Sequence, residues 1–126
     1  MNSLKKCIII LISVLVLSLF TGCGEKAKSF EYDPGEPFVT DVFKSTRLLK
    51  VDITIEVTDE KLVELLTANT AKVRDTIVFI LRSKTEEELK GLAPNDGLKT
   101  EIIDKLKEKF DTSSISEIYV SDLVIQ

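Results

Sequence analysis

The sequence contains no histidine and no tryptophan, and its two cysteines, Cys7 and Cys23, both lie near the N-terminus. Without histidine the chain lacks the side chain that ordinarily titrates near neutral pH, which excludes the usual general base, the usual catalytic triads and most zinc sites. No cysteine follows residue 23, so the remainder has no internal disulfide and no thiol nucleophile. The formal net charge of −4 argues against a nucleic-acid partner, because phosphates require a basic face.

Residues 1–23 predict a hydrophobic signal or anchor segment. Two lysines precede the apolar stretch Cys7–Phe20, and Thr21-Gly22 lies directly before Cys23. As a helix, that stretch would span about 21 Å, which is shorter than a hydrocarbon core of roughly 30 Å. Its LFTGCG ending resembles the lipobox of bacterial lipoproteins, a motif whose cysteine thiol receives a diacylglycerol while the preceding peptide is removed. Cys23 is therefore the candidate lipid-attachment residue.

The alternative to a cleaved lipoprotein signal is an uncleaved membrane anchor. In that case Cys23 is only a small residue at the membrane interface. In both cases the two lysines hold the N-terminus inside, so the following domain lies outside the cytoplasm. Residues 24–36 mix charge, serine, glycine and proline without any period, and this composition predicts a flexible tether. Residues 37–126 then form one domain with a modest core.

Alternation of apolar and polar residues predicts a strand over 49–57, with one face on the core and one in water. Around it, Phe38–Phe43 is expected as a short strand or an extended lead-in. Ser116–Gln126 is predicted as a closing strand, interior to the sheet or at an intersubunit contact, because both of its faces carry apolar side chains.

Ile77–Leu81 is a run of five apolar residues whose periodicity alone does not separate a buried strand from a buried helix. A helix is favoured because Thr70 can serve as its N-cap and because one helical face collects Val73, Ile77, Ile80 and Leu81. Val78 and Phe79 widen that apolar face, so this central helix must be covered on more than one side.

Three further helices are expected. Thr58 is the predicted N-cap of the first, whose buried side chains are Leu62, Val63, Leu65 and Leu66. Thr85 and Glu88 fit a capping box at the start of a short one. The third has apolar residues every four positions at Leu98, Ile102, Leu106 and Phe110. The predicted fold class is α+β, a small sheet of about three strands with helices packed on it.

The order of these segments resembles the FliL family of flagellar basal-body-associated proteins. The resemblance is borne by RLLKVDITIEV, KVRDTIVFILRSKTEEEL, DGLKTEIIDKL and the terminal SEIYVSDLVIQ, and it runs from about Pro37 to Gln126. It implies a stomatin/prohibitin-like domain outside the cytoplasmic membrane, without a cofactor, and members are thought to ring the stator units and support swimming. The lipobox-like ending departs from the full transmembrane helix of that family.

Three functional hypotheses are open at this point. The first, which the resemblance implies, is a non-enzymatic partner of the flagellar stator and basal body at the outer face of the cytoplasmic membrane, forming a homo-oligomeric ring. The second is a generic extracytoplasmic lipoprotein module that binds a small ligand or an envelope component in a concave apolar pocket. The third, an enzyme with paired carboxylates, is disfavoured because Asp and Glu are scattered over solvated positions.

Overall fold

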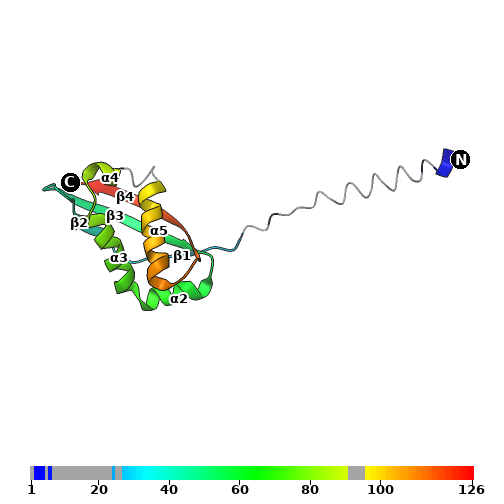
Figure 1. Cartoon of the computed structure of the whole chain (residues 1–126), viewed down its shortest axis with the longest axis horizontal. Helices are drawn as coiled ribbons and strands as arrows, with labels where there is room; N and C mark the ends of the chain where they lie inside the picture. Colours follow the sequence, from blue (N-terminus) through cyan, green and yellow to red (C-terminus); the bar gives the residue numbers. More distant parts are fainter. Residues whose placement is uncertain (1, 5, 7–23, 25–26, 91–95) are drawn as a thin grey trace.

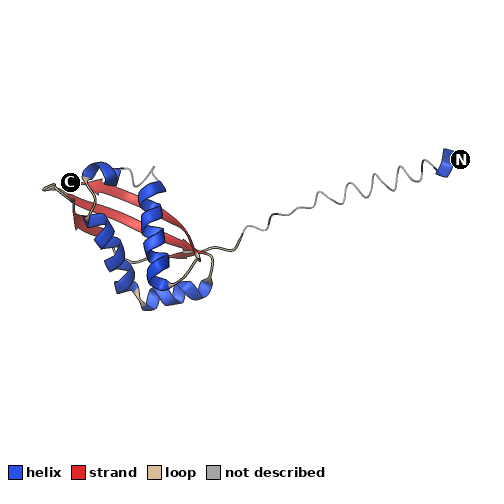
Figure 2. Ribbon diagram, viewed as in Figure 1, coloured by secondary structure: helices blue, strands red, loops and turns tan. Residues whose placement is uncertain are grey.

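The structure is a computed structural model that describes residues 2–4, 6, 24, 27–90 and 96–126. Within these residues it is an α+β domain in which helices α3 (Thr70–Arg82) and α5 (Asp96–Phe110) lie across one face of an antiparallel sheet (Figures 1 and 2). Helix α2 (Glu60–Ala68) follows the sheet's central strand, and the short α4 (Glu86–Lys90) follows α3.

Strand β3 (Leu48–Val57) organises the sheet. Strand β4 (Ile115–Ile125) pairs with it from Leu49 to Val57, and so occupies one of its two edges along its length. The other edge is shared by β1 (Phe30–Tyr32) and β2 (Phe38–Asp41), which pair with opposite halves of β3. The described sheet therefore has four strands but is only three strands wide, where the sequence predicted about three strands.

The core lies between the sheet and the helices. Along β3, the apolar members of the alternating pattern are all buried, as predicted. Helix α3 presents Val73, Ile77 and Leu81 to the same core with no exposed surface, and α5 contributes Ile102 and Leu106. The predicted central helix and the predicted four-residue repeat of α5 are thus confirmed, because each places a continuous apolar stripe against the sheet.

Strand β1 lies inside the segment for which the sequence predicted a flexible tether, so that prediction is wrong for Phe30–Tyr32. The Tyr32 side chain is buried, and its hydroxyl donates to the Leu66 carbonyl at 3.3 Å and lies 2.9 Å from Thr70 Oγ1. The following turn is held by Arg74, which donates to the carbonyls of Pro34 and Glu36 at 3.2 and 2.7 Å. Ordered structure therefore begins before residue 37.

Two predicted N-caps are displaced by one residue. Asp59, not Thr58, caps α2, and its carboxylate accepts from the Lys61 amide at 3.0 Å. The Thr58 hydroxyl, which would have to accept from the helix, instead donates to the Ser114 carbonyl beside the sheet at 3.4 Å. Thr70 is not the cap of α3 but its first residue, and its hydroxyl bonds back to the Thr67 carbonyl at 3.0 Å.

The predicted capping box of α4 is confirmed. The Thr85 amide donates to Glu88 Oε2 at 2.8 Å, and the Glu88 amide donates to Thr85 Oγ1 at 3.4 Å. These two bonds satisfy donors that the first turn of a helix leaves free. The pKa of Glu88 is lowered by the hydrogen bond from the Thr85 amide and by a second one from the Thr85 hydroxyl at 2.8 Å, because both favour the ionised carboxylate.

Strand β4 pairs only with β3 among the described residues, so it is an edge strand and not interior to the sheet. Its register shifts between Lys50 and Asp52 of β3, where β4 has one residue more than its partner. Asp122 lies in this bulge with φ 50°, in the left-handed region that few residues other than glycine adopt. On the face away from the helices, Tyr119 and Val124 are each 47% exposed.

Two apolar side chains predicted to be buried on the helices are exposed. Leu65 of α2 has 44% of its surface exposed and Phe79 of α3 has 76%. Helix α3 contacts both the sheet and α5. Phe79 borders α5 only across surface hollows, so most of its ring remains exposed.

These burial values predict opposite outcomes for two substitutions on one helix. Ile77→Ala removes a fully buried side chain and should lower the free energy of unfolding by about 2–5 kcal/mol. Phe79→Ala, the matched control on the exposed side, should change it by no more than about 0.5 kcal/mol. Urea unfolding of residues 27–126 followed by circular dichroism measures both. A loss below about 1 kcal/mol for Ile77→Ala would contradict the assignment of this side chain to the core.

Candidate functional surfaces

The residue predicted as the lipid-attachment site, Cys23, lies outside the described residues, as does Cys7. Among the helices that the structure describes, none combines the length and the apolar character needed to cross a membrane. Residues 27–90 and 96–126 therefore form the part in which other sites can be sought.

The acidic side chains of the described residues form no group of three or more that could hold a metal ion. Those at the start of α4 stabilise the fold. Glu86 accepts from Arg47 Nη1 at 2.6 Å and from Lys90 at 2.8 Å, and these contacts, the Lys90 hydrogen bond first, lower its pKa. Arg47 also donates through Nη2 to the Ile125 carbonyl at 2.7 Å, which ties α4 to the end of β4.

The face of the sheet that the helices leave uncovered is acidic at one end. Glu31, Glu56 and Glu117 lie opposite one another on β1, β3 and β4. Like charges in such cross-strand positions repel. The negative charge of Glu56 is partly stabilised, because its carboxylate accepts hydrogen bonds from the hydroxyls of Tyr119 at 3.0 Å and Ser116 at 2.9 Å. The bond to Glu56 is the main reason why the pKa of Tyr119 is raised.

The other end of this face is apolar. Val39 and Val124 flank Lys50 on the neighbouring strands, and Leu48 lies two residues away on β3. The exposed fractions are 60% for Val39, 47% for Val124 and 41% for Leu48. We call these three residues the sheet patch. Two of them belong to the segments that resemble the FliL family.

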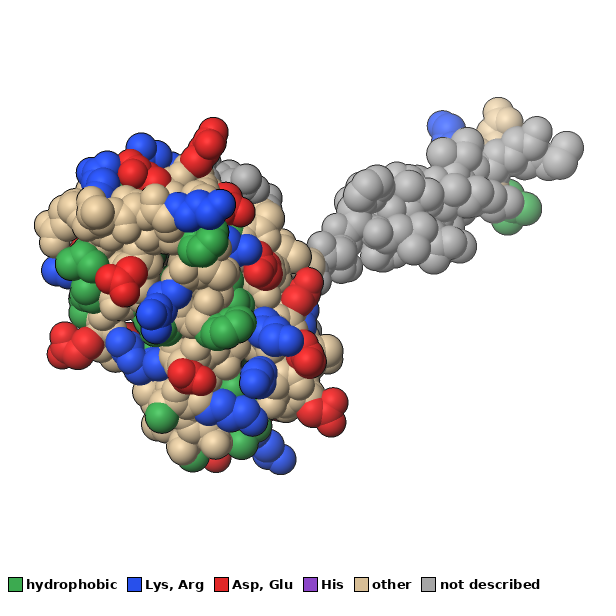
Figure 3. All heavy atoms as spheres, turned by 60° about the vertical axis from the view of Figure 1, so that its left-hand side comes forward, with side chains coloured by type: hydrophobic (Ala, Val, Ile, Leu, Met, Phe, Trp, Pro, Cys, Tyr) green, Lys and Arg blue, Asp and Glu red, His purple; other side chains and the backbone are tan. Residues whose placement is uncertain are grey.

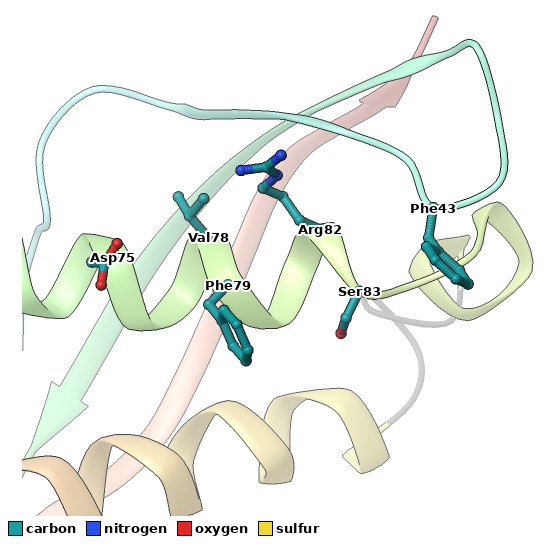
Figure 4. Close-up of a pocket in the computed structure, with 6 residues that line it drawn as sticks. All are labelled: Phe43, Asp75, Val78, Phe79, Arg82 and Ser83. Carbon is teal, nitrogen blue, oxygen red and sulfur yellow. The ribbon is translucent and has the colours of Figure 1, made fainter.

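A second exposed surface lies on α3. A hollow on its outer side is lined by Phe43, Asp75, Val78, Phe79, Arg82 and Ser83 (Figure 4). A smaller hollow next to it shares Val78 and Arg82 and reaches Val39 and Leu48. In space-filling view, apolar side chains appear on this side of the molecule as small patches bordered by charged groups (Figure 3). An apolar centre with a charged rim is the usual make-up of a protein-binding surface.

Periodicity did not identify these surfaces. It assigned Phe79 to the buried stripe and left Val39 and Val124 without a stated face. The one signal present in the sequence was that α3 is apolar over most of its circumference, so that a single layer of sheet could not cover it. Which side remains bare depends on where α5 packs, and this is a tertiary property.

Comparison with known proteins identifies the chain. The family model for "Flagellar basal body-associated protein FliL" matches residues 32–126, which extend from the last residue of β1 to the end of β4 and beyond. The chain belongs to the FliL family. The FliL family is non-enzymatic and flagellar. The match leaves out residues 1–31, and with them Cys23.

A curated relative agrees with this assignment. "Flagellar protein FliL" of Aquifex aeolicus (strain VF5) is 24% identical over 99 residues, which are 77% of this chain and 60% of that protein. The chain thus spans less than two thirds of the length of this FliL protein. The segments that carried the sequence resemblance lie inside the family match and overlap β3, α3, α5 and β4.

Proposed function

We propose that this FliL-family domain associates with the stator units of the flagellar motor and supports torque generation, as a scaffold and not as a catalyst. The observation that carries the proposal is the family match over residues 32–126, which covers all of the described domain except the start of β1. The surfaces support it, because the bare apolar side chains lie on a helix and on a sheet face and not inside a deep pocket.

We place the domain at the outer face of the cytoplasmic membrane, next to the basal body. Residues 1–23 provide the attachment, either through a lipid on Cys23 or as an uncleaved anchor. Two acyl chains hold a protein stably at a membrane where one does not. Attachment also concentrates many copies on one surface, so weak contacts between copies become effective.

We further propose a head-to-tail ring of copies around the stator, with the exposed faces of Arg47–Val57 and Tyr119–Gln126 contributing. The sheet patch supports this, because Leu48 and Val124 belong to these two segments and are both exposed. A closed ring repeats one contact around the assembly and leaves no free end. Such a contact need not be strong in solution.

Deletion of the gene should reduce swimming in soft agar while flagella remain assembled, because a scaffold for the stator affects torque and not filament growth. A plasmid copy of the full-length gene should restore swimming, and flagella are counted by electron microscopy. Swimming at the wild-type rate, with flagella and stators assembled as usual, would contradict the proposed function. The alternative ligand-binding module predicts that outcome.

Cys23→Ser should block processing and leave an unlipidated precursor of higher mass than the mature protein. Cys7→Ser is the matched control, and it should be processed as the wild type because Cys7 lies in the removed peptide. Intact-mass spectrometry of the membrane fraction distinguishes them. An intact N-terminus without a thioether-linked lipid on the wild-type protein would decide for the plain anchor.

The ring predicts crosslinked ladders. Thr54→Cys and Val124→Cys are combined in one Cys7→Ser chain, since these two positions are not cross-strand neighbours and do not face each other within one copy. Oxidation in cells should give dimers and higher species that depend on expression of the stator. Either cysteine alone should give dimers at most, because one thiol forms one bond. If this pair and similar pairs give only monomers at normal protein levels, the ring is wrong.

A further inference from the structure

The exposed side of α3 has a pattern that is complementary to itself. Asp75, Phe79 and Arg82 are spaced i, i+4 and i+7, so they lie on one face of the helix. Figure 4 looks onto this face, with Phe79 directed toward α5 and Arg82 directed away from it. The opposite face contains the buried Val73, Ile77 and Leu81. An apolar side chain thus lies between an acidic and a basic residue.

The aromatic ring of Phe79 is the most exposed large apolar side chain among residues 27–90 and 96–126. Phe43, which is 47% exposed, borders the same hollow, and Val78 is only partly buried there. Isolated exposed apolar residues are common on protein surfaces, but adjoining ones with a charged rim mark a contact site.

The two charges that flank Phe79 are available for a partner. Asp75 has no ion pair or hydrogen bond through its carboxylate among the described residues, and it is exposed. Arg82 approaches only Asp41, at 3.9 Å, and both side chains remain more than 60% exposed. Neither Asp75 nor Arg82 is therefore committed to the fold of its own chain.

Besides Asp41, two sources of charge border this face. Lys44 lies 5.3 Å from the centre of the Phe43 ring, and the charged groups beside Phe79 come from α5. Lys105 is paired with Glu108 at 2.7 Å, and Glu101 is paired with Lys84 at 2.7 Å. Asp104 and Lys109 line neighbouring hollows beside Phe79 with opposite charges. The α5 side of the face is therefore close to balanced, and the free charges of α3 itself decide which partner fits.

We propose that this face binds the same face of a second copy, with the two α3 helices antiparallel across a two-fold axis. An axis between Val78 and Phe79 lies midway between Asp75 and Arg82. It brings Asp75 of each copy opposite Arg82 of the other, and the two Phe79 rings meet near the axis. One geometry satisfies both ion pairs at once, because the seven-residue spacing, about 10.5 Å, is the same in both helices.

The charges of Asp75 and Arg82 favour a second copy of this chain as the binding partner. A different protein would have to supply a basic and an acidic residue at this spacing around an apolar centre, whereas this chain already carries that arrangement. The contact involves one helix from each copy, so it is smaller than the roughly 1,200–2,000 Å² of a stable interface. It forms where copies are concentrated, and the proposed membrane attachment provides that condition.

This contact is distinct from the proposed ring contact. It is centred on Phe79 of α3, whereas the ring contact lies on β3 and β4, and the two surfaces adjoin at the hollow that Arg82 shares with Leu48. The α3 contact is isologous and ends after two copies, whereas a head-to-tail contact continues around the ring. The two inferences therefore fail independently of each other.

The test uses two full-length copies with different tags, both with Cys7→Ser, expressed together and oxidised in cells. One carries Asp75→Cys and the other Arg82→Cys, so that the two thiols face each other across the axis while the second Asp75–Arg82 pair stays intact. The mixed disulfide should exceed the product of either copy alone. Glu64→Cys, an exposed position on α2, replaces Asp75→Cys in the matched control and should give background product only.

Charge reversal in the remaining pair sharpens the test. The Asp75→Cys copy is made with Arg82 or with Arg82→Asp, and the Arg82→Cys copy with Asp75 or with Asp75→Arg. Either reversal alone opposes like charges and should lower the mixed disulfide at least about twofold. Both reversals together restore opposite charges and should restore the yield. Because each reversed copy occurs in a low and in a restored combination, misfolding cannot produce this result.

A mixed disulfide no more abundant than the product of either copy alone would overturn the proposal. Equal yields in all four charge combinations would also overturn it, because the two ion pairs would then have no part in the contact. A chain without an added cysteine, oxidised in parallel, gives the background from Cys23.

Discussion

The burial of every second side chain of β3 is the constraint on which the rest of the domain depends. Its five alternating apolar residues are almost fully enclosed, which requires strands on both edges and helices over one face. Strand β4 forms hydrogen bonds along one edge of β3, and the two short strands β1 and β2 share the other edge. The helices cover this row with their own buried apolar side chains, and removing the whole core from water is the main favourable term in folding.

The parts of the fold that the sequence predicted are those that a local repeat determines. Alternation in β3 and the four-residue repeat in α5 need no knowledge of a partner, and the Thr85–Glu88 box closes within one turn. Strand β1 was missed because three residues set no period, and its place depends on a bond from Tyr32 to Leu66. Thr and Asp are both good N-cap residues, so the sequence alone could not choose between Thr58 and Asp59. The Thr58 hydroxyl donates to Ser114, which is far away in the sequence, and Asp59 caps the helix. Lipid attachment at Cys23 stays a prediction, because it rests on a sequence motif and not on packing.

The exposed apolar surfaces also divide into a part that the sequence predicts and a part that depends on tertiary packing. That α3 is too apolar for one covering layer is visible in the sequence, but that Phe79 is the bare side chain depends on the position of α5. In the same way, Val39 and Val124 become neighbours across Lys50 only when β2 and β4 pair with β3 from opposite sides. This FliL-family domain therefore keeps an apolar core inside and exposes apolar side chains on elements that are far apart in the chain.

The bulge at Asp122 limits how far this protein can associate through its backbone. An unbroken edge strand offers a row of free amides and carbonyls to any other strand, and growth by that route has no natural end. The left-handed residue in β4 interrupts the row part-way and twists the remaining residues of the strand out of register. The edge of β4 therefore does not offer a second copy the continuous row that a straight strand would, and the fold is protected against fibre-like stacking.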